Sequence, residues 1–266
     1  MNPQTIWQDI VTIREKAPLV HNITNYVVMN TTANALLALG ASPVMAHAVE
    51  EADEMTSLAA AVGGALVINI GTLSRHWIDA MSLAMKTAEK QRLPIVFDPV
   101  GAGATGLRTE TCRRLLSETA PTVIRGNASE IMALLDAEVR TKGVDSAHAA
   151  GDALNAARHL AKAHGCVVCV SGAEDMVTDG EAVLTVANGH PMMTRVTGLG
   201  CTATALIGAF VAVNADALAA TAHAMAVMGI AGELAAEQSA GPGTLQLHFY
   251  DALYNLSETL IAGRLK

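Results

Sequence analysis

The sequence predicts an α/β fold in which a mostly parallel sheet is flanked by helices on both faces. Apolar runs of strand length alternate with helical patterns, as they do in right-handed β-α-β units. The runs 65–71 and 94–98 are almost wholly apolar, which is typical of parallel strands buried on both faces. Because 51% of the 266 residues are hydrophobic and no linker or repeat divides the chain, we expect a single domain over residues 1–266.

Glycine and charge patterns set the boundaries of the elements in the first half of the chain. Gly40 and the pair Gly63-Gly64 are stop signals for helices, and acidic residues crowd positions 50–54, where a helix N-terminus favours negative charge. We expect strands at 18–21, 43–46, 65–71 and 94–98, and helices at about 26–39, 50–62 and 74–91.

The second half continues the alternation and ends in helices. Asp179-Gly180 is typical of a two-residue hairpin turn, here between strands 176–178 and 182–186. Gly241-Pro242-Gly243 separates the last two helices. We expect further strands at 122–125 and 166–171, and helices at about 110–117, 128–135, 146–164, 201–213, 216–238 and 245–262.

Charge and cysteine content narrow the classes of partner. The net charge is −8 and no basic run occurs, so nucleic acid and anionic membranes are not expected partners. The longest apolar run, 203–213, is shorter than the ~20 residues of a bilayer span, and residues 1–15 lack a signal-peptide core. We expect a cytoplasmic protein in which Cys166 and Cys169 are buried thiols and form neither a zinc site nor a disulfide.

Polar side chains gather directly after the expected strands. In a parallel sheet the carboxyl ends of the strands meet at one edge, and ligands collect there. The candidates at this edge are Asn22, Asn25, Met45, 69–72, Asp98, 125–130 and Ser171-Gly172.

A glycine turn precedes the apolar helix expected at 201–213. Gly198 and Gly200 let the backbone point successive N–H groups at one spot, and the helix N-terminus adds unpaired N–H groups and the positive end of its dipole. The pattern equally fits a tight turn with Cys201 as a core thiol. If the turn is an anion hole, Cys201 lies at its edge, and the helix N-terminus is expected to lower the pKa of its thiol.

Asp98 and the segment 125–130 each allow a structural and a functional interpretation. Asp98 precedes Pro99 and fits either a turn cap or a carboxylate ligand of Mg²⁺. Asn127 and Glu130 have the spacing of a capping box, whereas Arg125 at a strand end suits a phosphate. A capping glutamate can also orient a metal-bound water.

The segment 21–25 is polar and leads from a strand into a helix. Its asparagines and threonine fit a helix cap, and with His21 they equally form a neutral hydrogen-bonding surface for a small polar ligand. Met45, at the neighbouring strand end, fits either a core position or the apolar wall of such a site.

Six of these segments resemble the hydroxyethylthiazole kinase family, in order and at matching spacing over about residues 10–260. They are His21-Asn-Ile-Thr-Asn25, Ala41-Ser-Pro-Val-Met45, Asn69-Ile-Gly-Thr72, Asp98-Pro99-Val-Gly101, Arg125-Gly-Asn-Ala-Ser-Glu130 and Thr197-Gly-Leu-Gly-Cys201. The resemblance implies a ribokinase-like fold. It also implies transfer of the ATP γ-phosphate to the hydroxyl of 4-methyl-5-(2-hydroxyethyl)thiazole, a salvage step towards thiamine phosphate.

The resemblance further implies how the two substrates are held. Met45 and Gly198 match substrate positions of the family, and Asn25 lies in the same pocket. Arg125 and Ser171 match positions that contact ATP. The family forms homotrimers with sites between subunits, so a homotrimer is implied as well.

The resemblance also implies roles at the reaction centre. Asp98 and Glu130 match acids associated with Mg²⁺, and Cys201 belongs with Gly198 and Gly200 to the catalytic turn. The wider superfamily carries an aspartate base where this chain has Cys201. Because phosphoryl transfer depends mostly on positioning and charge stabilisation, a weak base is sufficient.

Two alternatives stay open on the sequence. A pyridoxal or hydroxymethylpyrimidine kinase of the same fold would be expected to carry aspartate in place of Cys201. A non-catalytic protein that binds a nucleotide or a thiamine precursor is disfavoured, because the glycine turn, Arg125 and the two acids occur together.

Overall fold

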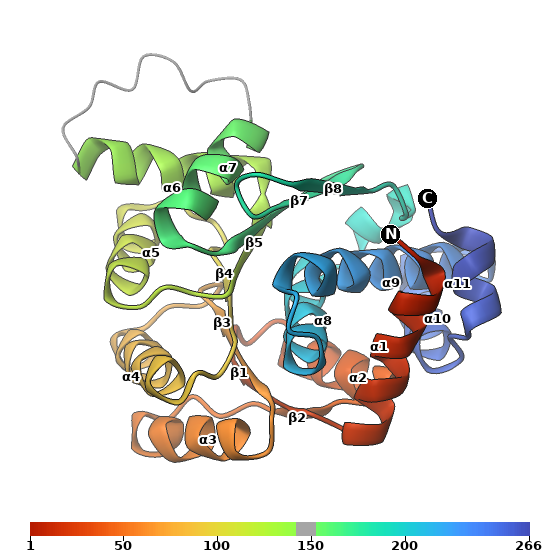
Figure 1. Ribbon diagram of the computed structural model, residues 1–266, viewed down its shortest axis with the longest axis horizontal. Coiled ribbons are helices and arrows are strands. Elements are labelled where there is room, and N and C mark those ends of the chain that lie inside the picture. The colour runs from red at the N-terminus through yellow and green to blue at the C-terminus, as the bar shows by residue number, and fades with distance from the viewer. Residues whose placement is uncertain (142–152) are drawn as a thin grey trace.

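One sheet runs through the centre of the molecule (Figure 1). The computed structural model describes the backbone of residues 1–141 and 153–266, and the side chains outside 137–152. The sheet has eight strands in the order β2-β1-β3-β4-β5-β6-β7-β8. They are β1 (Leu19–Ile23), β2 (Ser42–Val44), β3 (Ala65–Asn69), β4 (Ile95–Asp98), β5 (Val123–Asn127), β6 (Val167–Ser171), β7 (Asp175–Thr178) and β8 (Val183–Val186).

The pairing confirms the mostly parallel sheet that the sequence predicts. Strands β1 to β6 pair in parallel, whereas β7 pairs antiparallel with both β6 and β8. The carboxyl ends of the first six strands therefore lie at one edge of the sheet.

Helices cover both faces of the sheet, as the sequence predicts (Figure 1). On one face lie α3 (Val49–Ala61), α4 (Arg75–Gln91), α5 (Gly106–Glu118), α6 (Ala128–Thr141) and α7 (Ala153–His164). On the other lie α1 (Pro3–Lys16), α2 (Met29–Leu39), α8 (Leu199–Val213), α9 (Ala217–Glu237), α10 (Pro242–Tyr254) and α11 (Glu258–Arg264). A short 3₁₀ helix, η1 (Pro191–Arg195), lies between β8 and α8.

Each layer of helices builds its own hydrophobic core against the sheet. Successive residues of β3 alternate between the two cores, because side chains of a strand point to opposite faces. Ala65 and Val67 pack in the core with α8, and Leu66 and Ile68 pack in the core with α4. This two-sided burial explains why the strand is almost wholly apolar.

Small residues let α8 lie close on the sheet. A Cβ placed on Gly208 would come within 2.7 Å of Val67 Cγ2 and 3.1 Å of Val20 Cγ1. The absence of a side chain at this position therefore fixes the distance between α8 and the strands β1 and β3. A hydrogen bond from Thr204 Oγ1 to Asp98 Oδ2 joins the first half of α8 to the carboxyl end of β4.

Two predicted boundaries at turns are wrong. The hairpin of β7 and β8 is present, but its connection spans 179–182, because Asp179 Oδ1 accepts hydrogen bonds from the backbone N–H groups of Glu181 and Ala182. The helix predicted at 245–262 is divided into α10 and α11, because Ser257 caps a new helix through Leu260 N–H.

Two further helix starts differ from the sequence-based expectation, which has no helix before residue 18 and starts another at about residue 110. Helix α1 has the pattern of a capped start, with Asn2 accepting from Gln4 N–H and a proline at the first turn. Helix α5 begins at Gly106 because Thr105 caps it through Arg108 N–H. Of the helix predicted at 146–164, residues 153–164 form α7 and the rest lie outside the described residues.

Helix α9 is long and apolar enough, by length and composition, to cross a membrane. In the structure 78% of its most apolar window is buried inside the protein, where it packs against α8 and α10. Burial in the core accounts for its composition.

Candidate active site

The turn before α8 has the backbone geometry of an anion-binding helix start. Gly198 adopts φ +85° as the N-cap residue, so α8 begins at Leu199 and Cys201 lies in its first turn. A Cβ on Gly198 would come within 2.5 Å of Val28 Cγ1, and a Cβ on Gly200 within 2.9 Å of Arg125 Nη1. One glycine therefore provides the positive φ, and the other allows a guanidinium group to lie against the backbone.

A chain of polar side chains, all buried except the half-buried Cys201, lies beside this turn. Asn25 Nδ2 donates to Cys201 Sγ (3.5 Å) and to Asn69 Oδ1 (2.9 Å). Asn69 Nδ2 and Thr204 Oγ1 both donate to Asp98 Oδ2, at 2.8 and 2.7 Å. We refer to Asn25, Asn69, Asp98, Cys201 and Thr204 as the buried network.

Backbone donors fix the orientation of both amides in the buried network. Val27 N–H donates to Asn25 Oδ1, and Gly71 N–H donates to Asn69 Oδ1. The Nδ2 group of Asn25 must therefore face Cys201, and every hydrogen-bonding atom of this amide is engaged within the protein. The sequence left open whether Asn25 offers a free polar surface to a ligand. In the structure its amide contacts the thiol of Cys201, and a contact of Asn25 with the substrate stays a prediction.

The thiol of Cys201 is less acidic than the sequence predicts. Burial raises its pKa to about 11, and the negative charge of Asp98 acts in the same direction. Hydrogen bonds from Asn69 and Asn25 and the charge of Arg125 oppose the rise without cancelling it. The expectation of a lowered pKa is wrong, because burial and the negative charge of Asp98 outweigh the groups that lower it. Cys201 is a neutral thiol at pH 7.

Asp98 is a buried carboxylate with one oxygen unpaired. Burial raises its pKa to about 6, while the nearby Arg125 guanidinium and the Thr204 hydroxyl lower it. Its Oδ2 is fully engaged in the buried network, but no described residue donates to its Oδ1, which is shielded from solvent. An unpaired, buried carboxylate oxygen fits a magnesium ligand, directly or through water.

Glu130 closes a capping box and also faces the loop that follows Asp98. Asn127 Oδ1 accepts from Glu130 N–H, and Glu130 Oε2 accepts from Asn127 N–H, so the predicted box is present. The second oxygen, Oε1, accepts from Gly101 N–H at 2.8 Å. The charge of Glu130 is near enough to raise the pKa of Asp98. Two carboxylates with phosphate oxygens and water are the usual Mg²⁺ environment, so these residues fit that ion.

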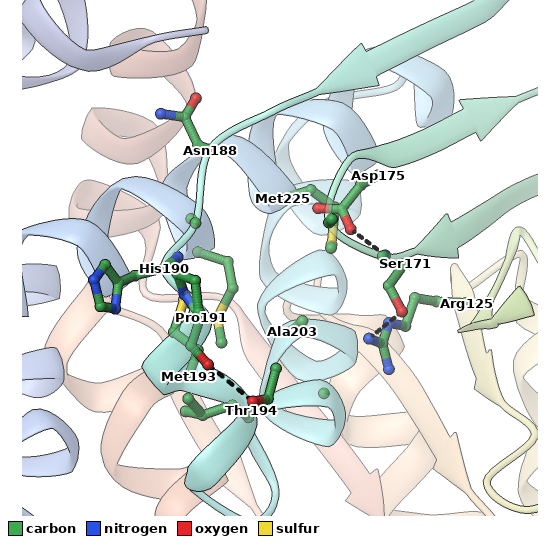
Figure 2. Close-up of a pocket in the computed structure, with 17 residues that line it drawn as sticks. Arg125, Ser171, Asp175, Asn188, His190, Pro191, Met193, Thr194, Ala203 and Met225 are labelled. Carbon is green, nitrogen blue, oxygen red and sulfur yellow. Dashed lines mark hydrogen bonds between the residues drawn. The ribbon is translucent and has the colours of Figure 1, made fainter. Parts of the chain in front are cut away.

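A cavity of about 640 Å³ opens on the other side of the α8 turn (Figure 2). At one end Arg125 Nη2 donates to Ser171 Oγ at 2.6 Å, while Arg125 Nε is buried and has no partner among the described residues. The Nη1 group of Arg125 lies against Gly200 at the start of α8, and a guanidinium group beside a helix N-terminus suits an anion. The lining residues are Arg125, 171–173, Asp175, 188–191, Met193, Thr194, Leu199, Gly200, Ala203, Met225, Met228 and Gly229.

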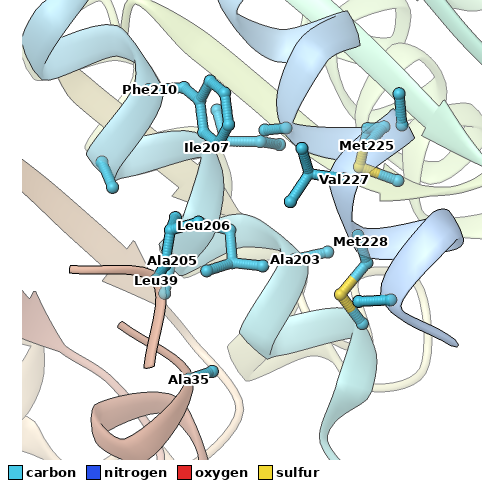
Figure 3. Close-up of a cluster of buried hydrophobic side chains, with 14 of the residues drawn as sticks. Ala35, Leu39, Ala203, Ala205, Leu206, Ile207, Phe210, Met225, Val227 and Met228 are labelled. Atoms are coloured by element: carbon cyan, nitrogen blue, oxygen red, sulfur yellow. The ribbon is translucent and has the colours of Figure 1, made fainter. Parts of the chain in front are cut away.

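The opposite side of the cavity is the edge of a hydrophobic core. Met225 and Met228 of α9 line the cavity and also pack with Leu206 and Ile207 of α8 (Figure 3). This side offers an apolar surface of flexible thioethers, which suits a flat ring. The cavity thus has a cationic end and an apolar end.

The structure divides the site residues predicted from the sequence into groups. Arg125, Ser171 and Gly200 line the cavity. Asn25, Asp98 and Cys201 belong to the buried network, and Glu130 lies next to it. Gly198 packs against the start of α2.

Met45 and His21 lie away from the cavity. Met45 directly follows β2 and is half-buried at the carboxyl edge of the sheet, apart from the residues that line the cavity. His21 is fully buried, donates from Nε2 to the carbonyl of Ala46 and pairs through Nδ1 with Thr56. Burial lowers the pKa of His21, so it is a neutral core histidine and contributes no surface to a ligand.

Sequence reasoning missed several residues of the site. Asn69 is among the predicted strand-end candidates, but the sequence does not indicate that its amide joins Asn25 to Asp98. Thr204 lies one helical turn after Cys201, and this spacing is the signal that could have identified it. Asp175 had no such signal, because the hairpin that brings it to the cavity is set by tertiary pairing.

Comparisons with known proteins agree on one family. The model of the hydroxyethylthiazole kinase family matches residues 10–259. A hydroxyethylthiazole kinase of Syntrophus aciditrophicus is 57% identical over 100% of this chain and 97% of its own length. The solved structure of a hydroxyethylthiazole kinase protein from Pyrococcus horikoshii OT3 is 46% identical. It superimposes with a TM-score of 0.90 and covers 99% of this chain and 98% of that one.

A more distant likeness concerns the fold. A ribokinase-like superfamily protein from Enterococcus faecalis V583 is 15% identical and superimposes with a TM-score of 0.56, covering 88% of this chain and 86% of that one. At this identity the likeness shows the fold alone. It confirms the ribokinase-like fold that the sequence resemblance implies.

Proposed function

The chain belongs to the hydroxyethylthiazole kinase family, and on that premise we propose that it transfers the γ-phosphate of ATP to the hydroxyl of 4-methyl-5-(2-hydroxyethyl)thiazole. One observation carries the proposal. The N-terminus of α8 separates a cavity with a cationic end from a buried network that contains a carboxylate. A kinase needs both, because a nucleotide and an acceptor hydroxyl must meet across one anion-binding turn.

ATP is proposed to lie in the cavity with its phosphates towards α8. Arg125 and Ser171 supply side-chain donors at this end, and Gly198 and Gly200 leave the first N–H groups of α8 accessible to a phosphate. The methionine side of the cavity would receive the base. As charge develops on the transferred phosphoryl group, the fixed N–H groups stabilise it without reorganisation.

Asp98 and Glu130 are the residues that would hold Mg²⁺. Bound there, the ion would neutralise charge on the phosphates of ATP. Oδ1 of Asp98, which has no partner among the described residues, would be the atom that holds the ion, while Asn69 and Thr204 hold the other oxygen in place. The carboxylate is thereby oriented in advance.

The acceptor hydroxyl is proposed to approach from the side of Cys201, Met45 and Gly198. With a pKa of about 11, the thiol of Cys201 is a poor base at pH 7, so its contribution is to orient the hydroxyl by shape and weak hydrogen bonding. Positioning and charge stabilisation then supply most of the catalysis.

A homotrimeric, cytoplasmic enzyme is part of the same proposal. Tyr26 and Val27 directly follow Asn25 and are each 64% exposed. Large apolar side chains this exposed beside a substrate site are typical of a surface that a second subunit covers. The half-buried Met45 lies at the same edge of the sheet. Contact with a neighbouring subunit would complete the acceptor site.

An ATP-consumption assay over three alcohols tests the proposal. Hydroxyethylthiazole, pyridoxal and hydroxymethylpyrimidine are compared at equal concentration, with and without excess EDTA. We expect turnover with hydroxyethylthiazole, loss of turnover with EDTA, and recovery when Mg²⁺ is restored. Faster turnover with either of the other alcohols, or ATP consumption that is independent of any acceptor, would contradict the proposal.

A further inference from the structure

Asp175 is a carboxylate in the cavity that the proposed chemistry does not use. It begins β7 and is only 7% exposed, yet it is one of the residues that line the cavity. Its Oδ1 accepts a hydrogen bond from Gly172 N–H at 2.9 Å, which closes the short loop after Ser171. No described residue donates a hydrogen bond to its Oδ2. Figure 2 shows this second oxygen turned towards Met225.

The position of Asp175 lies between the two ends of the cavity. Arg125 and Ser171 are on one side of it, and Met225 is on the other (Figure 2). Burial raises the pKa of Asp175 to about 6, while the hydrogen bond from Gly172 N–H and the charge of Arg125 lower it, so the side chain is mostly a carboxylate at neutral pH. A carboxylate can only accept hydrogen bonds, and it repels phosphate oxygens.

We propose that Oδ2 of Asp175 accepts a hydrogen bond from a ribose hydroxyl of the nucleotide and thereby selects ribonucleotides over deoxyribonucleotides. This rests on the proposed placement of ATP in the cavity. In a nucleoside triphosphate the sugar joins the phosphates to the base, so it lies between the cationic end and the apolar end. A vicinal diol is a pair of donors at that place, and O–H donors make short, strong hydrogen bonds to a carboxylate.

Kinetics with deoxynucleotides test this inference in the full-length protein. The kcat and KM for ATP, 2′-deoxy-ATP and 3′-deoxy-ATP are measured with saturating hydroxyethylthiazole. For the unaltered protein we expect at least one deoxynucleotide to have a KM about 10- to 100-fold above that of ATP, with kcat little changed, because one charge-assisted hydrogen bond is lost.

The isosteric variant Asp175→Asn isolates the free oxygen. An asparagine keeps an acceptor for Gly172 N–H and replaces Oδ2 by an amino group. We expect the KM for ATP to rise about tenfold or more and the preference for ATP over the deoxynucleotide to fall towards one. Asp179→Asn is the matched control, because Asp179 also accepts backbone N–H groups in the same hairpin but lies outside the cavity. Asp179→Asn should keep the preference of the unaltered protein for ATP over the deoxynucleotide.

Several outcomes would overturn the inference. Equal KM values for ATP and both deoxynucleotides in the unaltered protein would do so whether or not the variant folds. An Asp175→Asn variant that keeps the preference for ATP over the deoxynucleotide would also overturn it. So would a variant in which the preference for ATP over inosine triphosphate changes, because that result would place the base at Asp175. Absence of any activity with ATP in the unaltered protein would contradict the proposed function itself.

Discussion

The two sides of the α8 N-terminus use their polar groups in opposite ways. In the buried network the side chains pair with one another, so that the Asn25 amide has no free hydrogen-bonding atom. In the cavity, the Nη1 group of Arg125 and one oxygen of Asp175 have no hydrogen-bond partner among the described residues. The first turn of α8 therefore separates polar groups that are hydrogen-bonded to one another from polar groups that have no hydrogen-bond partner.

This difference indicates separate roles for the buried network and for the cavity. Groups that satisfy one another are held in one geometry before any ligand arrives, which suits the orientation of reacting atoms. Groups left unpaired in a cavity gain their partners from a ligand, which suits binding. Asp98 belongs to both sides, because one oxygen is fixed by the buried network and the other is unpaired.

The largest effect is expected from Arg125→Lys. Lysine keeps the positive charge but cannot reproduce the planar donor group that reaches Ser171 and lies against Gly200. We expect kcat/KM for ATP to fall about 10²- to 10³-fold with little change in the free energy of unfolding. Steady-state kinetics and urea unfolding measure the two quantities.

Arg113→Lys is the control for this variant. Arg113 is exposed, and its partner among the described residues is Glu110 on the same helix, so its replacement should leave both quantities unchanged. If Arg125→Lys keeps the kcat/KM for ATP of the unaltered protein, the cationic end of the cavity does not bind phosphate. The assignment of ligand binding to the cavity would then be wrong.

An intermediate effect is expected from Asn69→Ala in the buried network. The change leaves the Asn25 amide without its acceptor and removes one donor from Asp98, and both groups are buried. We expect a loss of about 1–3 kcal/mol in the free energy of unfolding, and about a tenfold or larger fall in kcat at an unchanged KM for ATP. The surface variant Asn34→Ala, which removes an exposed bond to Asn30, should alter neither. A rise in the KM for ATP equal to the fall in kcat would show that the two sides are not separate.

The sequence predicts more of the fold than of the candidate site. Alternating apolar runs and glycine stops predict the parallel sheet, because burial on both faces leaves a local pattern. The strand-end rule brings Arg125 and Ser171 to one edge, where the structure joins them by a hydrogen bond. The capping box at Asn127 and Glu130 is equally local and is present.

Features that depend on tertiary packing could not be predicted from the sequence. The pKa of Cys201 follows from burial and from Asp98, which is distant in sequence, so the local rule for helix N-termini gives the wrong sign. The partner of each asparagine amide also depends on a neighbouring strand. Asp175 becomes a cavity residue only through the antiparallel pairing of β7.

The smallest effect on turnover is expected at Cys201. With a thiol pKa of about 11, the thiolate fraction at pH 7 is about 10⁻⁴, so alkylation of Cys201 by iodoacetamide should be slow and should quicken about tenfold per pH unit from pH 7 to 10. Mass spectrometry of the labelled peptide measures the rate, and the fully buried Cys112 and Cys169 serve as internal references. Cys201→Ala should keep kcat within about tenfold of the unaltered protein, because the N–H groups of α8 remain. A labelling rate that levels off by pH 8 would mean an acidic thiol poised as a base. The side of α8 that holds the buried network would then take the acceptor proton as well as orient the reacting groups.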